Sequence, residues 1–114
     1  MKTSPNNALG QFEQMVITTI IALGDNAYGT ALQRKLAELY GDGKEVNLGS
    51  VYVTLERLET KQYVESWFTE PLAERGGRSR RCYRVLPKGK RALQKAISIQ
   101  QRSLALLTKS WTIS

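Results

Sequence analysis

The sequence predicts a mainly α fold that carries a single β-hairpin. Apolar residues recur every three or four positions in four segments, which is the spacing of amphipathic helices. Between the third and fourth segments, two short runs alternate aromatic and β-branched residues around a glycine-containing loop, as the strands of a hairpin do. The predicted order is helix, helix, helix, strand, loop, strand, helix within 114 residues, a length that suits one domain with one core.

The first predicted helix spans residues 9–23 and carries two apolar strips. The main strip has spacings of 3, 4, 4 and 3 residues and consists of Leu9, Phe12, Val16, Ile20 and Leu23. Ile17 and Ile21 form the second strip, so this helix is expected to be buried on more than one side.

The second predicted helix spans residues 28–39 and follows the three turn residues GDN. Asn26, the last residue of that turn, is expected to cap the helix with its side chain. The buried face is expected to consist of Leu32, Leu36 and Leu39. Two glycines in the stretch YGDGKEV then end this helix and form a loop.

The third predicted helix begins after Asn47 and ends at residue 61 or 62. The Asn47 side chain can accept a hydrogen bond from the free backbone amide of Gly49 or Ser50, as a helix cap does. The core face of this helix is expected to consist of Leu48, Val51, Leu55 and Leu58.

The opposite face of the third helix lacks the Lys and Glu that exposed helix faces usually carry. With about 100° between successive residues, this face consists of Gly49, Ser50, Val53 and Arg57, with Glu56 beside it. Small residues allow close approach to a DNA groove, an apolar side chain can contact the thymine methyl group, and Arg can pair with guanine. This face is therefore a candidate DNA-reading surface.

Three residues of this surface have specific expected roles. Val53 is expected to make an apolar contact with a base, and Ser50 a polar contact through its hydroxyl. Tyr52 lies on the flank, where its hydroxyl can reach a phosphate or its ring can pack half-buried. For Val53 the alternative is an isolated exposed apolar residue without a role, since such residues are common.

The hairpin is predicted from residues 63–68 and 80–86, joined by the loop TEPLAERGGRS. This loop is longer than a tight hairpin needs, and long loops in compact domains are often functional. Arg75, Arg78 and Arg80 lie at or near its tip and are expected to reach phosphates or a narrow minor groove. Arg81 and Arg84 lie on opposite faces of the return strand, where DNA contact and a structural role are both open.

The last predicted helix begins at Pro87, which suits a first helical turn, and ends near residue 109 or 111. Over some 23 residues it would span roughly 35 Å, which is longer than one small domain can cover. Its seam is heptad-like with one polar interruption, and consists of Leu93, Ile97, Gln100, Leu104, Leu107 and Trp111. Part of this seam is expected to need a partner, and self-association is the simplest one.

Charge is distributed unevenly along the chain. The net charge is +7; residues 1–74 contain six Lys or Arg and ten Asp or Glu, whereas residues 75–114 contain eleven Lys or Arg and no acid. A positive field confined to one part of the chain attracts polyanions, nucleic acid first and anionic membrane second. A basic helix that is merely solvated is the alternative, and both interpretations apply to Lys88, Lys90 and Arg91.

Composition disfavours several classes of function. Histidine is absent, which removes His-based triads, His metal ligands and His general acid–base chemistry. The single cysteine, Cys82, excludes an internal disulfide and a multi-cysteine zinc site, and is interpreted as a small strand residue. No apolar run is long enough to cross a membrane, and the N-terminus lacks a secretory signal. We therefore expect a cytoplasmic protein that is not an enzyme and uses no cofactor, metal or membrane.

Three helices followed by a hairpin with a basic loop predict a winged helix-turn-helix. In this fold the third helix enters the DNA major groove, and the hairpin, or wing, meets the backbone or the minor groove. Residues 1–86 would form the DNA-binding domain and residues 87–114 a C-terminal dimerisation helix, in one compact unit. A dimer would place two recognition helices in successive major grooves of a palindromic site, about 34 Å apart.

A winged helix that acts as a protein–protein adaptor is the alternative, because fold alone does not fix function. The one-sided basic field argues against it, since an adaptor does not need that field.

Three stretches resemble the PadR family of bacterial transcriptional regulators over residues 8–95: LGDNAYG, VNLGSVYVTLERLETKQYVES and EPLAERGGRSRRCYRVLPKGKRAL. The resemblance implies a homodimeric winged-helix repressor whose C-terminal helix packs against the partner's N-terminal helix. The recognition-helix pattern of the family falls on Tyr52, Leu55, Arg57 and Leu58. The wing pattern falls on Arg75, Gly76, Gly77, Arg78, Arg81, Tyr83 and Arg84.

Some members of the PadR family bind phenolic or other planar aromatic effectors, often near the dimer interface. The resemblance makes Phe12 and Trp111 candidates to line such a space in this chain. Packing in the core or the interface is the alternative for both residues, and no effector is assigned.

Overall fold

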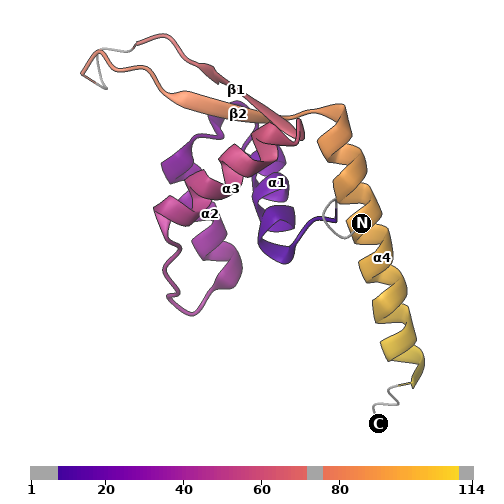
Figure 1. Cartoon of the computed structure of the whole chain (residues 1–114). Helices are drawn as coiled ribbons and strands as arrows, with labels where there is room; N and C mark the ends of the chain where they lie inside the picture. The colour runs from indigo at the N-terminus through magenta and orange to yellow at the C-terminus, as the bar shows by residue number, and fades with distance from the viewer. Residues whose placement is uncertain (1–7, 72–75, 111–114) are drawn as a thin grey trace.

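The computed structural model describes residues 8–71 and 76–110, so Arg75 and Trp111 lie outside the described residues. Three helices come first: α1 (Gln11–Leu23), α2 (Gly29–Tyr40) and α3 (Leu48–Thr60), with a short 3-10 turn, η2 (Gly24–Asn26), after α1. The hairpin strands β1 (Val64–Phe68) and β2 (Arg81–Val85) and the helix α4 (Pro87–Ser110) follow. Figure 1 shows the hairpin across one end of the three-helix body, with its loop extending to one side and α4 leaving at the other.

This arrangement confirms the predicted mainly α fold and its winged helix-turn-helix order. The predicted helices and strands are present, and their boundaries lie within two residues of the expected ones. The agreement follows from strong local signals, because each helix carries a clear apolar period and each break contains glycine, asparagine or proline.

The core lies where α1, α2 and α3 meet beneath the hairpin. Each helix buries the side chains that recur at three- and four-residue spacing. Side chains that are at most 2% exposed include Val16, Ile17, Ile20, Leu32, Leu36, Val51, Leu55, Leu58 and Val64. Full burial of one Leu, Ile or Val side chain contributes about 1.5–3 kcal/mol, so this packing gives α3 a firm support.

Three residues expected in the core are less buried than predicted. Leu39 is 55% exposed and Ile21 is 49% exposed, and Leu48 is only partly buried. Ile21 and Leu39 each lie in the last turn of their helix. The apolar pattern therefore extends past the part of each helix that its neighbours cover.

The expected capping of α2 by Asn26 is wrong. Asn26 ends the 3-10 turn, and Tyr28 occupies the N-cap position of α2 without a side-chain cap. The reason lies in the sheet, because the chain stays extended between η2 and α2 and pairs with the hairpin. Tyr28 forms an isolated antiparallel bridge with Cys82, and the Tyr83 amide donates to the Ala27 carbonyl at 2.9 Å.

The hairpin pairs β1 with β2 in antiparallel register, from Val64 opposite Val85 to Phe68 opposite Arg81. The pairing continues beyond the strands, because the Thr69 amide donates to the Arg80 carbonyl at 2.8 Å and the Arg80 amide donates to Thr69 Oγ1 at 3.0 Å. The pairing of the two arms of the wing therefore extends to Thr69 and Arg80.

Among the described residues, helix α4 is buried only near its beginning. Gly89 is buried so closely against the Tyr63 carbonyl that an added Cβ would overlap the carbonyl oxygen. Leu93 is the last buried residue of α4 in the described chain, and every side chain from residue 97 to residue 110 is exposed. Figure 1 shows α4 diverging from the body toward its C-terminal end. None of the helices in the described part of the chain is long and apolar enough to cross a membrane.

Candidate nucleic-acid interface

The exposed face of α3 begins at a capped N-terminus. Asn47 is the N-cap, and its Oδ1 accepts a hydrogen bond from the Ser50 amide at 3.0 Å. Gly49 and Ser50 are exposed in the first turn, followed by Val53, which is 54% exposed, and by the exposed Arg57. The four predicted residues therefore share one accessible helix face, opposite the buried Val51, Leu55 and Leu58.

Tyr52 lies at the edge of this face and contacts α2. It is 45% exposed, and an added Cβ at Gly29 would overlap its hydroxyl oxygen. The Tyr52 ring therefore packs against the first turn of α2 while one side remains open. Tyr52 is therefore a half-buried packing residue at the border of the candidate surface.

Two of the three arginines predicted at the tip of the wing, Arg78 and Arg80, lie within the described residues. Arg78 is exposed, and Arg80 is partly buried with its guanidinium centred 4.0 Å from the middle of the Tyr28 ring. This cation–π contact holds the Arg80 side chain at the base of the loop. Arg75 lies outside the described residues.

The two arginines whose role was open both have carboxylate partners. Arg84 Nε lies 2.8 Å from Glu65 Oε2, and the Arg84 guanidinium stands over the Trp67 ring at 4.5 Å. Arg81 Nη2 lies 3.0 Å from Glu59 Oε1. These pairs favour the structural interpretation for both arginines, because each charge is already matched within the protein.

Arg81 also belongs to a network that the sequence did not reveal. Its Nε donates to Ser66 Oγ at 3.1 Å, and Ser66 Oγ donates to Glu59 Oε2 at 2.7 Å. Glu59 lies in the last turn of α3, Ser66 in β1 and Arg81 in β2. The sequence contains the opposite charges of Glu59 and Arg81, but it does not indicate that they meet. Their contact depends on how the hairpin packs over α3.

A cleft of about 240 Å³ separates α3 from the wing. Its lining residues are Tyr52, Val53, Glu56, Glu59, Arg81 and Tyr83. Burial raises the pKa of the Tyr83 hydroxyl, an effect that the nearby Arg81 charge partly offsets. Phe68, which is 68% exposed on β1, is a further residue of the wing that the sequence did not single out.

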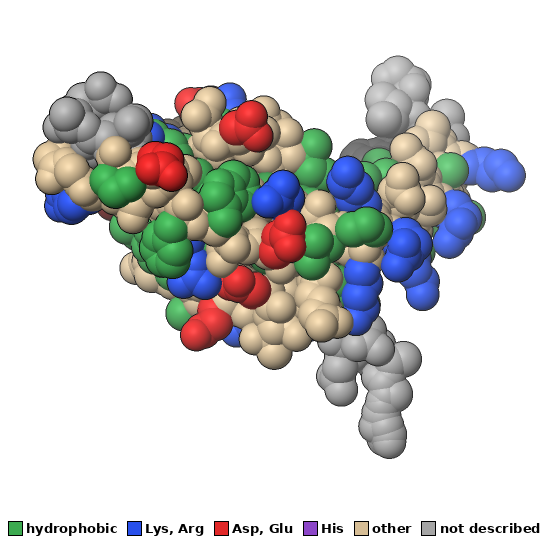
Figure 2. Space-filling view, turned by 90° about the horizontal axis from the view of Figure 1, so that it is seen from above, with side chains coloured by type: hydrophobic (Ala, Val, Ile, Leu, Met, Phe, Trp, Pro, Cys, Tyr) green, Lys and Arg blue, Asp and Glu red, His purple; other side chains and the backbone are tan. Residues whose placement is uncertain are grey.

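The basic residues of the C-terminal part gather around α4. Figure 2 shows the blue Lys and Arg side chains concentrated at the end of the molecule where α4 lies, and mixed with acidic ones elsewhere. Exposed cations of α4 include Lys88, Lys90, Arg91, Lys95, Arg102 and Lys109. The positive field is therefore strongest beside the hairpin base and along α4.

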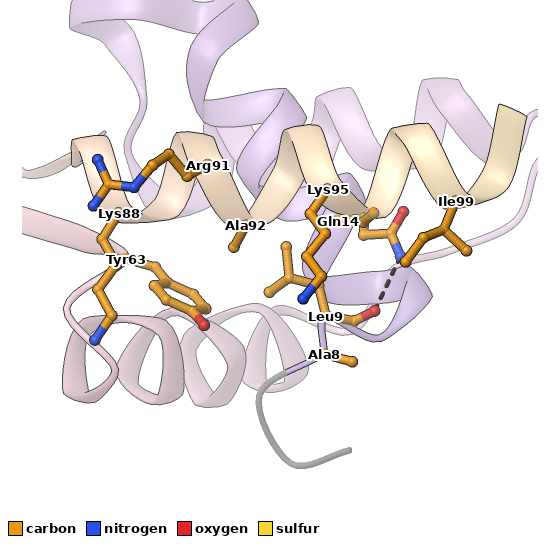
Figure 3. Close-up of a pocket in the computed structure, with 10 residues that line it drawn as sticks. Ala8, Leu9, Gln14, Tyr63, Lys88, Arg91, Ala92, Lys95 and Ile99 are labelled. Atoms are coloured by element: carbon orange, nitrogen blue, oxygen red, sulfur yellow. Dashed lines mark hydrogen bonds between the residues drawn. The ribbon is translucent and has the colours of Figure 1, made fainter. Parts of the chain in front are cut away.

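A cavity of about 480 Å³ lies between α4 and the segment that precedes α1. In Figure 3 the Tyr63 ring points into this space, and the Lys95 side chain crosses from α4 toward Leu9. The Gln14 side chain donates to the Leu9 carbonyl at 3.0 Å and closes one side. Phe12 does not line this cavity; it lines a smaller one beside Asn47, and Trp111 lies outside the described residues.

A supported helix with an open, partly apolar face, next to an arginine-bearing hairpin, defines a winged-helix protein of the nucleic-acid-binding class. The chain belongs to the PadR-like family of transcriptional regulators, whose family model matches residues 19–95. It is therefore a DNA-binding transcriptional regulator, and membership of this family agrees with the expectation that it is not an enzyme.

Solved structures of similar fold come from several bacteria. A PadR-like transcriptional regulator from Bacillus cereus is 21% identical, with a TM-score of 0.70 over 90% of this chain and 93% of that one. A PadR family regulator from Clostridium difficile is 20% identical, with a TM-score of 0.67 over 86% and 96% of the two chains. One from Eggerthella lenta is 26% identical, with a TM-score of 0.60 over 81% and 75%. The sequence matches no curated protein.

Proposed function

We propose that the protein is a cytoplasmic repressor that binds a palindromic operator as a homodimer. The observation that supports the dimer is the solvent exposure of the C-terminal half of α4. Its exposed large apolar residues are Ile97, Ile99, Leu104, Leu106 and Leu107. Burial of one such side chain contributes about 1.5–3 kcal/mol, so a second chain that covers this surface stabilises both copies.

The surface that receives the partner's α4 lies on the same side of the body. The exposed Leu39 lies there, at a cavity of about 200 Å³ between α1 and α4. The lining of this cavity includes Met15, Leu39 and Ile97. In a two-fold symmetric dimer, the apolar seam of each α4 is buried against α1 of the other chain. Such an assembly is closed and leaves no apolar seam exposed.

On DNA, the exposed face of α3 enters the major groove and the wing meets the phosphates or the minor groove. The residues proposed for these contacts are Gly49, Ser50, Tyr52, Val53, Arg57, Arg75, Arg78 and Arg80. Residues 1–86 form the part that binds DNA, and residues 87–114 form the dimerisation helix. Two copies read two half-sites about 34 Å apart.

Selection of bound duplexes from a random pool, followed by sequencing, tests this function. We expect a palindromic site, two chains per duplex and affinity that falls steeply between roughly 50 and 200 mM salt. A transcription assay with the selected site upstream of a reporter tests repression. A site without symmetry, or one chain per duplex, contradicts the proposal.

A small effector is a second proposal, supported by the cavity beside α4. Its volume lies in the range of ligand pockets, about 300–1,000 Å³, and its lining combines Tyr63 with Lys88, Arg91 and Lys95. An aromatic carboxylate matches this lining. Calorimetric titration with benzoate and 4-hydroxybenzoate tests the site, with Lys95→Gln expected to weaken binding and Lys109→Gln, outside the cavity, expected to leave it unchanged. Equal binding by both variants contradicts the site.

A further inference from the structure

The wing and the recognition helix are joined by one closed network of three side chains. Glu59 accepts from Arg81 Nη2 at 3.0 Å and from Ser66 Oγ at 2.7 Å, while Ser66 Oγ accepts from Arg81 Nε at 3.1 Å. The Arg81 guanidinium also stands 5.7 Å from the centre of the Tyr83 ring and 5.8 Å from that of Phe68. We name Glu59, Ser66 and Arg81 the hairpin clamp.

The clamp lies where the wing leaves the body of the protein. Arg81 and Phe68 are the last paired residues of the two strands before the loop. Closer to α4, the hairpin is held by the buried Val64 and Tyr83, and its outer edge is held by the bridge to Tyr28. A two-stranded hairpin is only marginally stable alone, so its distal part depends on contacts with α3.

We propose that the hairpin clamp consists of positioning residues, which fix the angle of the wing relative to α3 when DNA binds. Arg80 lies one residue before the start of β2, and Arg78 lies three residues before it, toward the loop. Their reach therefore depends on the direction of the strands at Arg81. When the clamp is closed, the wing already has the orientation that it needs to contact phosphates while α3 lies in the groove. Binding then costs less conformational entropy. This inference rests on the proposed contact of the wing with DNA.

Charge and geometry make opposite predictions for Glu59, which makes the clamp testable. Glu59 is an acid beside the candidate DNA surface, in the cleft with Val53 and Glu56. If only charge matters, replacing this carboxylate by an amide removes repulsion from the phosphates and strengthens DNA binding. If the clamp positions the wing, the same replacement weakens binding, because Arg81 loses its charged partner.

The matched control is Glu65→Gln. Glu65 pairs with Arg84 on the opposite face of the same hairpin, at 2.8 Å, and has no hydrogen bond to α3 among the contacts described. The two substitutions change the net charge equally, and each removes the carboxylate partner of one strand arginine. Ser66→Ala opens the clamp without any change of charge.

The experiment measures DNA affinity of the full chain at several salt concentrations, with unfolding curves to verify folding. For Glu59→Gln and Ser66→Ala we expect at least about fivefold weaker binding and a salt slope lower by about one per lost phosphate contact. For Glu65→Gln we expect affinity within twofold of wild type or tighter. Unchanged or tighter binding by Glu59→Gln, or an equal loss in Glu65→Gln, overturns the proposal. If Glu59→Gln fails to fold, Ser66→Ala decides by the same criteria.

A double variant separates failure of the clamp from failure of the wing contact. If Arg78→Ala with Arg80→Ala binds DNA like wild type, the proposed wing contact is wrong, and the clamp has nothing to position. If that variant loses affinity while Glu59→Gln and Ser66→Ala keep it, only the clamp is wrong. Hydroxyl-radical footprinting adds a direct readout, because an open clamp removes protection by the wing and leaves protection by α3.

Discussion

At the scale of single residues, the contact between Gly29 and Tyr52 joins helices α2 and α3. The first turn of α2 leaves no room for a Cβ at Gly29, because the Tyr52 hydroxyl and ring occupy that space. Gly29 therefore permits the close approach of the Tyr52 ring to the first turn of α2.

We predict that Gly29→Ala destabilises the protein by about 1–3 kcal/mol, the usual effect of overpacking. In a Tyr52→Ala background the same substitution should have a much smaller effect, because the obstructing ring is gone. Urea unfolding of the four proteins in this cycle measures the coupling. Thr30→Ala, at the exposed next position, is the control and should change stability little in either background.

Tyr83 gives the stability of the protein a dependence on alkaline pH. Burial raises the pKa of its hydroxyl above the ordinary value of 10.0. Because the folded chain holds this proton more tightly than the unfolded chain, the stabilisation is complete below about pH 10 and is lost as the pH rises through the folded pKa.

We therefore expect stability to fall less steeply above pH 10 in Tyr83→Phe than in wild type. Urea unfolding at pH 8 and at pH 10.5 to 11 measures the difference. Tyr40→Phe removes an exposed tyrosine and should retain the wild-type slope. Parallel slopes in wild type and Tyr83→Phe would show that Tyr83 does not cause the loss.

Helical periodicity was sufficient to predict which residues of α3 are exposed, because one buried stripe fixes the opposite face. It placed Ser50, Val53 and Arg57 on the accessible side, where the structure has them. The link between Glu59, Ser66 and Arg81 could not be predicted in this way. Those residues come from three elements, and only the packing of the hairpin over α3 brings them together.

At the scale of elements, the wing is a two-stranded sheet, and the chain just before α2 pairs with the outer edge of β2. This pairing includes the bridge between Tyr28 and Cys82. The sequence indicated both strands but not this pairing, because a one-residue bridge has no period to recognise. For the same reason the expected cap at Asn26 was wrong, since the pairing of residues 27 and 28 moves the start of α2 along the chain.

The wing arginines yield a prediction that separates DNA binding from assembly. Arg78→Ala combined with Arg80→Ala should weaken DNA binding and lower the slope of log K against log salt by about 1.8, since each phosphate contact contributes about 0.9. Fluorescence anisotropy across a salt series measures the slope, and light scattering measures the mass. The mass of the proposed dimer should stay unchanged, because neither residue lies near α4.

A protein–protein adaptor would give a different result for that variant. Removal of both arginines would then leave DNA affinity as low as before and would not change the salt slope. A normal slope in the double variant would count against the wing contact even if α3 still reads the bases.

At the scale of the whole molecule, the chain divides into a packed body and a projecting helix. Its extents are 58 × 38 × 21 Å, and the hairpin and α4 extend from the body on opposite sides. The heptad-like seam predicted a helix too long for one domain, and the exposure of residues 97–110 agrees with that expectation. What covers this helix could not be predicted from its own periodicity, because a seam does not specify its partner.

We predict that Leu104→Arg converts the proposed dimer to a monomer and abolishes tight operator binding. Leu104 is 54% exposed on the seam, and a charge buried in an apolar interface is strongly unfavourable. Analytical ultracentrifugation measures the mass. Ser98→Arg adds the same charge on the polar side of α4 and should remain dimeric, whereas monomeric wild type would refute the proposed assembly.

In the proposed dimer, the buried Gly89 has a consequence for the spacing of the two half-sites. Its contact with the Tyr63 carbonyl sets the direction of α4, which has 24 residues and thus acts as a lever about 36 Å long. Tilting such a helix by about 10° at its base moves the far end by about 6 Å, which is the rise of about four helical residues. A side chain at residue 89 would therefore change the spacing of the half-sites that the proposed dimer can bind.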